Sequence, residues 1–459
     1  MTLRLTMVLA LLVLVTQQLA AQWTQLGNDI EGSTSSEYSG RSVSANATGN
    51  IIATSSVNFS NTRGRIKVFS YNSTTGAWVQ LGNSILGSSA DRLGESVSLN
   101  AAGNIIAVGG SGRNASSSLI DVGVVQVYMY NGTSWVQLGS DILGSQNVEQ
   151  LGRAVSLSAD GLTLAIGSPT YDNGTRSASG RVRVYRYNGS RWSLSGILES
   201  TNAGYELGTS VDISADGSTI VAGGPGSSNP TFNSSKGKMA IFRLNGGSWI
   251  EEYSYIAQNR GYRLGVNVTV NADGSRVGIT VPGDLRNQQG TGSVRFFEKI
   301  NNNWTQTSTI TNVTRGYGIA LDSIGSTVAV GVLGGAARGY INIYKKNGTS
   351  WTFQGGNILG NSGDGFGGVL DLNYDGYTVI GGAPSADYSF RSNAGAARVY
   401  RSPQPCTASN SSITITACDS YMALSGNYTF TTSGTYMDTI SNTCGADSII
   451  TINLTINNS

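Results

Sequence analysis

The stretch YNGTSWVQLG at residues 130–139 returns, with few changes, as KNGTSWTFQG at residues 346–355. Its tryptophan belongs to a series of seven at nearly even spacing: Trp23, Trp78, Trp135, Trp192, Trp249, Trp304 and Trp351. A turn glycine recurs in the same order, at Gly49, Gly103, Gly161, Gly217, Gly274, Gly325 and Gly376. A second glycine opens strand-like runs such as GVVQVY and GRVRVY, again seven times. Three marks in one order indicate seven copies of a single unit of roughly 55 residues.

One unit shows the secondary structure that the others repeat. In LGRAVSLSADGLTLAIG, residues 151–167, an alternating run is followed by an Asp-Gly turn and a more apolar run. Asp-Gly between two such runs predicts a hairpin, because glycine accepts positive φ without a Cβ clash. A variable loop, the alternating run GRVRVYRY, the turn NGSRW and the tryptophan strand complete the unit. We therefore expect four short antiparallel strands per unit, named a, b, c and d in chain order, and no helical periodicity.

Seven small sheets in series predict an all-β fold, a seven-bladed β-propeller over residues 22–402, because radial stacking covers both faces of each sheet. The first unit begins with a tryptophan strand, residues 23–30, and the last unit ends after ARVYRS without one. We expect the N-terminal strand to complete the last blade and close the ring. The seven tryptophans are expected to be structural, packed between neighbouring blades.

The first residues and the composition point to export. Residues 1–21 combine one basic residue, an apolar core and small residues before a cleavage point, which predicts a secretory signal peptide. The alternative, a membrane anchor, is disfavoured because the apolar core is shorter than the ~20 residues that span a bilayer. The net charge of +2 argues against a nucleic-acid partner, and the chain has no His, the commonest general base and metal ligand. We expect a secreted protein with no transmembrane segment and no cofactor.

The runs GESVSL, GNIIAVGG, FGG and GGAP resemble the FG-GAP repeats of integrin-α-type propellers. The likeness covers about residues 23–402 and implies a secreted or surface-displayed module that binds other proteins or glycans. Many members of that family hold calcium in a DxDxDG-type loop, whereas the corresponding turns here read SADG or NATG. Those turns lack the spaced carboxylates that a hard cation needs, so no metal site is expected.

The C-terminal residues, 403–459, do not continue the repeat. We expect a Pro/Ser-rich linker at residues 403–412 and a small β module at 413–459, where CDSY, SGTYMDTI and DSIITINLTI resemble modules of secreted Bacteroidetes-type surface proteins. The resemblance implies a disulfide between Cys418 and Cys444. It leaves Cys406 odd, either free or joined to another chain.

Function is expected in the loops that vary between units. The a–b and c–d turns are short and nearly identical, whereas the b–c loops differ in every unit and share a face with the d–a loops. The variable polar and aromatic residues there are the candidate ligand-binding residues: Arg41, Arg153, Tyr171, Asp172, Phe232, Asp284, Arg286, Asp387, Tyr388 and Arg391. The protein is predicted to be secreted or displayed at the cell surface. Its predicted role is adhesion to, or binding of, an extracellular protein or glycan.

The alternative function is a polysaccharide-acting enzyme, a glycosidase or lyase, with carboxylates at the central opening. The candidates stand near the start of strand a: Asp91, Glu95, Glu149, Glu206 and Asp364. Arginines occupy the same neighbourhood, and no nucleophile, phosphate-loop or zinc motif accompanies them. The non-enzymatic interpretation is therefore preferred.

Overall fold

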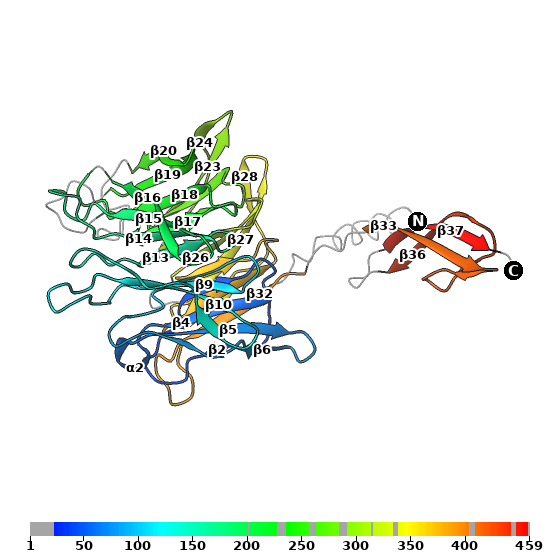
Figure 1. Ribbon diagram of the computed structural model, residues 1–459, viewed down its shortest axis with the longest axis horizontal. Coiled ribbons are helices and arrows are strands. Elements are labelled where there is room, and N and C mark those ends of the chain that lie inside the picture. Colours follow the sequence, from blue (N-terminus) through cyan, green and yellow to red (C-terminus); the bar gives the residue numbers. More distant parts are fainter. Residues whose placement is uncertain are drawn as a thin grey trace, which may run out of the picture. The chain divides into compact units, whose positions relative to one another are not determined.

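The computed structural model of the chain describes residues 23–200, 202–226, 236–257, 263–283, 292–313, 315–333, 338–403, 409–441 and 447–457 (Figure 1). The chain divides into two compact units, with the division after Ser402. The predicted signal peptide lies outside the described residues. In the described residues nearly all regular structure is strand, so the all-β prediction is confirmed.

The described residues of the first unit form seven antiparallel sheets of four or five strands, which fits a propeller-like arrangement (Figure 1). The first sheet consists of β3 (Ser39–Ala45), β4 (Ile51–Ser56), β5 (Arg65–Asn72), β6 (Ala77–Gln80) and β7 (Ile85–Leu86). The second consists of β8 (Ser96–Leu99), β9 (Ile105–Gly110), β10 (Val124–Tyr130), β11 (Trp135–Gln137) and β12 (Ile142–Leu143). The third consists of β13 (Ala154–Leu157), β14 (Thr163–Ser168), β15 (Arg181–Tyr187) and β16 (Trp192–Glu199). A four-residue helical turn, α2 (Phe59–Thr62), lies between β4 and β5.

The next three sheets repeat the pattern. The fourth sheet consists of β17 (Ser210–Ile213), β18 (Thr219–Gly224), β19 (Lys238–Asn245) and β20 (Ser248–Ile256). The fifth consists of β21 (Val268–Val270), β22 (Arg276–Val281), β23 (Ser293–Ile300) and β24 (Asn303–Thr311). The sixth consists of β25 (Gly316–Leu321), β26 (Thr327–Val332), β27 (Arg338–Asn347), β28 (Ser350–Phe353) and β29 (Ile358–Ser362). The predicted four antiparallel strands per unit are confirmed, and in several sheets the d strand is split into two short pieces that both pair with strand c.

The last sheet joins the two ends of the first unit. It consists of β30 (Leu370–Leu372), β31 (Thr378–Ala383) and β32 (Ala396–Arg401), and the N-terminal β1 (Thr24–Gln25) and β2 (Ile30–Glu31) pair with β32. The d position of this sheet is therefore occupied by the first strands of the chain.

The recurring glycines allow neighbouring sheets to approach closely. Gly123, which precedes strand c, has a φ of +86°, and a Cβ there would lie 2.1 Å from the carbonyl oxygen of Leu151. A Cβ on Gly109 of β9 would likewise lie 2.1 Å from the Gly152 carbonyl oxygen of the next unit. A side chain at either position would overlap backbone atoms, so the glycine marks follow from sheet-to-sheet contact.

The core consists of apolar layers between neighbouring sheets, and the tryptophans border them. One layer combines Ile66 and Val68 on β5 with Val108 on β9 and Trp135 on β11. The Trp135 indole N–H donates to the Leu81 carbonyl oxygen of the preceding sheet at 2.9 Å, and equivalent bonds run from Trp78 to Leu26 and from Trp192 to Leu138. Each of these tryptophans therefore links two sheets.

The a strands follow one another around the first unit. Each contacts the a strand of the next sheet, and β30 in turn contacts β3. The a–b turns continue this order through seven backbone N–H to carbonyl bonds of 2.9–3.1 Å. These bonds run from Ala47 to Ala101, Ala159, Ala215, Ala272, Ser323, Tyr374 and back to Ala47.

The second unit is a small β module. Strand β37 (Asp447–Asn457) pairs in parallel with β33 (Ser409–Cys418) and antiparallel with β36 (Gly434–Ser441), and β34 (Tyr421–Met422) pairs with β35 (Thr429–Phe430). Ile450, Ile452 and Leu454 are buried in its core. Cys418 is exposed and has no disulfide partner among the described residues. Cys406 and Cys444 lie outside them, so the expected Cys418–Cys444 bond stays a prediction.

Candidate functional site: a central cavity at the loop face

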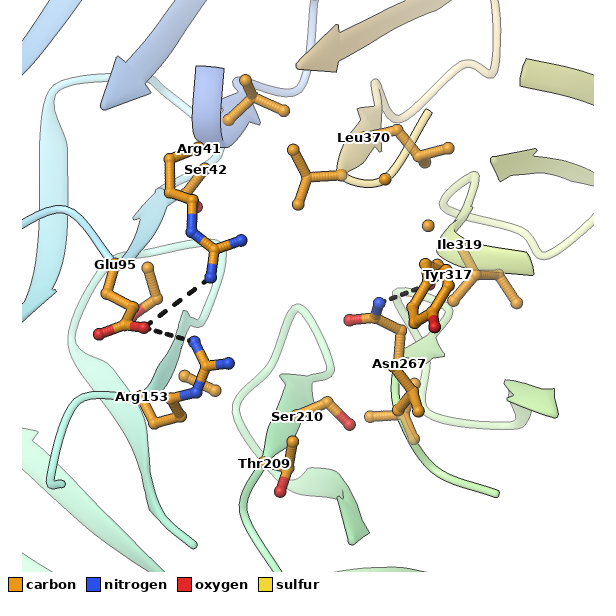
Figure 2. A pocket seen from close by; sticks show the side chains of 18 of the residues that line it. Arg41, Ser42, Glu95, Arg153, Thr209, Ser210, Asn267, Tyr317, Ile319 and Leu370 are labelled. Carbon is orange, nitrogen blue, oxygen red and sulfur yellow. Dashed lines mark hydrogen bonds and ion pairs between the residues drawn. The ribbon is translucent and has the colours of Figure 1, made fainter. Parts of the chain in front are cut away.

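The antiparallel order of each sheet places the a–b and c–d turns at one end of the first unit and the described parts of the b–c and d–a loops at the other. We call the second end the loop face. A cavity of about 620 Å³ opens there, and residues from all seven a strands or their leading loops line it (Figure 2). We call it the central cavity.

One wall of the central cavity, the one toward the loop face, is formed by residues at a position that recurs in every unit of the sequence. The residue directly after the glycine of the d–a loop lines the cavity in all seven units: Arg41, Glu95, Arg153, Thr209, Val266, Tyr317 and Gly368. One aliphatic side chain from each a strand lines it as well: Val43, Val97, Val155, Val211, Val268, Ile319 and Leu370. The cavity thus joins a wall of varied chemistry to a uniform apolar belt.

Charge is concentrated on one side of the cavity. Glu95 Oε1 lies 2.7 Å from a guanidinium nitrogen of Arg153, 3.4 Å from one of Arg92 and 3.9 Å from one of Arg41. The other carboxylate oxygen accepts the hydroxyl of Ser111. Burial lowers the pKa of Arg41, and repulsion from Arg153 and Arg92 lowers it further, while Glu95 acts in the opposite direction.

The opposite side of the cavity carries uncharged polar side chains, and Arg263 lines the cavity from the loop that leads to β21. Figure 2 shows Asn267 and Tyr317 across from the arginines, with Thr209 and Ser210 between the two sides. The Asn267 amide donates to the Tyr317 carbonyl oxygen, and the Ser210 hydroxyl donates to the Gly265 carbonyl oxygen at 3.0 Å. These bonds fix the side chains and leave hydroxyl and amide oxygens able to accept.

Among the described residues, two of the sequence-predicted ligand-binding residues line the central cavity. These are Arg41 and Arg153. Tyr171, Asp172, Asp387, Tyr388 and Arg391 lie in b–c loops outside the cavity lining. Phe232, Asp284 and Arg286 lie outside the described residues.

The b–c loop candidates hold their own loops in place. The Tyr171 ring packs 3.5 Å from the Arg181 guanidinium, and Asp172 accepts the Ala178 N–H at 2.7 Å. In the last sheet Asp387 accepts the Asn393 N–H at 2.6 Å, and Arg391 pairs with Glu31 at 2.6 Å. Such contacts order the loop face without filling its centre.

The carboxylates considered for catalysis are distributed differently from the expectation. Only Glu95 lines the central cavity. Asp91, Glu149 and Asp364 are buried and paired with arginines: Asp91 with Arg113, Glu149 with Arg181 and Arg183, and Asp364 with Arg398. Glu206 is not among the cavity-lining residues, and its carbonyl oxygen accepts the Thr209 hydroxyl at 2.8 Å.

Two aspartates on the a strands were not singled out from the sequence. Asp212 on β17 accepts the Val270 N–H at 2.8 Å, and Asp371 on β30 accepts the Ala45 N–H at 2.8 Å, so each joins its sheet to another. The sequence signal is an Asp in SVDIS and VLDLN where other units have Ser, as in SVSLN. Burial raises the pKa of Asp371 to about 6, helped by the charge of Asp212, although bonds from the Ala45 and Leu372 N–H groups oppose the rise.

This raised pKa predicts a pH-dependent loss of stability. An acid whose folded-state pKa exceeds its unfolded value contributes stability below the unfolded pKa, and that stability is lost as the pH rises through the folded pKa. Asp371→Ser keeps a hydroxyl acceptor and removes the charge. Between pH 4 and 6.5 we expect the wild type to lose about 1–3 kcal/mol of unfolding free energy relative to this variant, measured by urea denaturation. Parallel stability curves would contradict the assignment.

The aspartates of the a–b turns form hydrogen bonds within those turns. Asp160, Asp216 and Asp273 each accept a backbone N–H two residues ahead, at 2.8–2.9 Å. In the described part of the chain, no group of three or more acidic, Cys or His side chains is placed to hold a metal ion. The same part contains no helix long and apolar enough to cross a membrane.

Comparison with known proteins gives information on the fold of the chain only. No protein-family model matches the chain, and no curated protein matches it. The solved structure of hydrazine synthase from Kuenenia stuttgartiensis matches with a TM-score of 0.50 at 13% sequence identity, over 78% of this chain and 94% of that one. At this identity the likeness concerns the fold alone. The chain thus shares its overall fold with a solved β-rich protein.

Proposed function

We propose that residues 22–402 form a seven-bladed β-propeller of FG-GAP-like type, closed by the N-terminal strands, and act as an exported binding module for an extracellular ligand. Support for seven closed blades comes from the seven-membered bond series that starts and ends at Ala47, and from the pairing of β1 and β2 with β32. Support for export comes from the signal-like residues 1–21, and for kinship from the FGG and GGAP runs.

One observation carries the binding function: the central cavity is lined by the residue that follows each d–a glycine, and the type of this residue differs widely between units. Val43, Val97 and Val155 beneath it are nearly invariant in type, whereas Arg41, Glu95 and Thr209 above it differ completely in chemistry. A residue position needed only for blade packing would repeat as the valines do. Concave sites with an apolar base and a few polar groups are typical of small-ligand binding.

Catalysis by paired carboxylates is the weaker alternative. Glycoside hydrolysis needs an acid and a second carboxylate on opposite sides of the scissile bond, ~5–10 Å apart. Of the five acidic residues considered for this role, only Glu95 lines the cavity, and three arginines neutralise it. A binding function without turnover is favoured.

The proposal is tested by blocking the cavity. Full-length mature protein is applied to glycan arrays and to pull-down assays with extracellular proteins, and any ligand is measured by calorimetry. Thr209→Trp places a large ring in the cavity mouth and is expected to weaken binding at least tenfold. The control Thr74→Trp adds the same ring to an exposed turn between β5 and β6, and is expected to bind normally.

Two results would overturn the binding function. Ligand binding that survives Thr209→Trp would place the site elsewhere on the surface. Turnover of a polysaccharide that disappears in Glu95→Gln, with binding retained, would establish the enzyme instead.

A further inference from the structure

The arginines of the central cavity outnumber its acidic groups. Arg41, Arg153 and Arg263 line the cavity, and Glu95 is the single carboxylate among the described lining residues. The Arg41 and Arg153 side chains are 39% and 34% exposed, whereas that of Glu95 is only 4% exposed. The positive groups therefore face the solvent in the cavity, and the negative group lies behind them.

The donors of these arginines are not exhausted by Glu95. A guanidinium has five N–H donors, and the described contacts of Arg41 and Arg153 with Glu95 use one nitrogen of each. Figure 2 shows the two guanidiniums approaching each other beside Glu95, at the edge of the cavity. Burial and repulsion from Arg153 disfavour the charged form of Arg41 and lower its pKa, and an incoming anion would offset that repulsion. A carboxylate matches the planar fork of an arginine.

The rest of the cavity suits a polyhydroxylated body. Thr209, Ser210, Asn267 and Tyr317 supply uncharged polar groups across from the arginines, and the aliphatic belt supplies a surface for the C–H face of a sugar ring. The volume of about 620 Å³ lies within the range of ~300–1,000 Å³ that is usual for small-molecule sites.

An extended peptide fits this cavity less well. Strand addition requires free backbone groups along a strand edge. The a-strand N–H groups of Val97, Leu99 and Leu157 are already bonded at 3.0–3.1 Å to the hydroxyls of Ser42, Ser44 and Ser98 on neighbouring sheets. The cavity wall thus offers side chains, and the strand edges are occupied.

We propose that the central cavity binds a uronic acid residue of an acidic polysaccharide, with Arg41 and Arg153 holding its carboxylate and Thr209, Asn267 and Tyr317 contacting its hydroxyls. The proposal rests on the proposed binding function and specifies its ligand. It requires no bond to be made or broken.

The test compares charged and neutral versions of the same sugar. Full-length mature protein is titrated by calorimetry with oligomers of galacturonate, glucuronate, mannuronate and guluronate, and with their carboxyl-reduced counterparts. At least one acidic oligomer is expected to bind, at least tenfold more tightly than its reduced form. The affinity for that oligomer is expected to fall with added salt.

Matched variants assign the contact. Arg41→Gln and Arg153→Gln, singly and together, are expected to reduce uronate binding at least tenfold while leaving the melting temperature within a few degrees. Arg191→Gln removes the same charge from the exposed c–d turn and is expected to change nothing. If the double variant does not fold, the single variants decide.

The outcomes separate the two proposals. Binding of neutral glycans or acidic peptides that Thr209→Trp blocks and the arginine variants leave intact would keep the binding module and overturn the uronate assignment. Failure of all four acidic oligomers to bind the wild type would also overturn it. Uronate binding that is unaffected by both Thr209→Trp and the arginine variants would overturn both proposals.

Discussion

Replacing Glu149 with glutamine is expected to lower the free energy of unfolding by about 3–5 kcal/mol, because two buried guanidiniums lose their counter-charge. Glu149 is fully buried, and one of its oxygens accepts from both Arg181, at 2.9 Å, and Arg183. Its other oxygen accepts the backbone N–H groups of Ser145, at 2.5 Å, and Gln146, at 3.1 Å. Glutamine keeps the shape but brings an NH₂ group against N–H donors.

The same carboxylate should contribute to acid sensitivity. Burial alone would raise the pKa of Glu149, but Arg183, the Ser145 N–H and Arg181 together lower it below the ordinary value. A lowered folded-state pKa gives stability that is present above the unfolded pKa and is lost as the pH falls, so Glu149→Gln should destabilise more at pH 7 than at pH 3.

A matched control distinguishes a buried pair from an exposed one. Glu31 and Arg391 form an ion pair with exposed fractions of 38% and 34%, and exposed pairs contribute only ~0–1 kcal/mol. Glu31→Gln should therefore change urea-induced unfolding by less than about 1 kcal/mol. Equal effects of the two substitutions would contradict the role given to Glu149.

The repeated features of the fold could be predicted because packing imposes the same demand in every sheet. The turn glycines, the alternating strands and the tryptophans recur since each sheet needs the same hairpins and the same contact with its neighbour. The blade count, the FG-GAP likeness and the disulfide remain predictions. The split of strand d into two pieces, as in β6 and β7, was not predicted, because nothing in a repeat pattern marks a break in hydrogen bonding.

The site was harder to find because its residues meet only in three dimensions. Arg41, Glu95 and Arg153 are more than fifty residues apart in sequence and become neighbours through sheet stacking. The sequence shows that a residue follows each d–a glycine, but it does not show that these residues line one cavity. Conversely, the variability of Asp172 and Asp387 suggested ligands, and the structure shows each bonded within its own loop.

Removing the N-terminal strands, residues 23–31, is expected to lower the free energy of unfolding of the first unit by on the order of 5 kcal/mol and to expose a strand edge. Ile30 is buried against the last sheet, and the Leu26 N–H donates to the Val399 carbonyl oxygen at 2.7 Å. Asp29 accepts from Arg398 at 2.8 Å and from the Tyr388 hydroxyl, so its loss removes one of the two carboxylates that pair with this buried arginine and leaves Asp364.

This effect can be measured and reversed with one reagent. The shortened chain should melt at a lower temperature and self-associate in analytical ultracentrifugation, because β32 would present unpaired backbone groups. A synthetic peptide of residues 23–33 should restore the melting temperature by occupying the vacant strand position, as added strands do. The same peptide with Asp29→Ala and Ile30→Ser should not. An unchanged melting temperature in the shortened chain would show that β1 and β2 cover the last sheet without holding the first unit together.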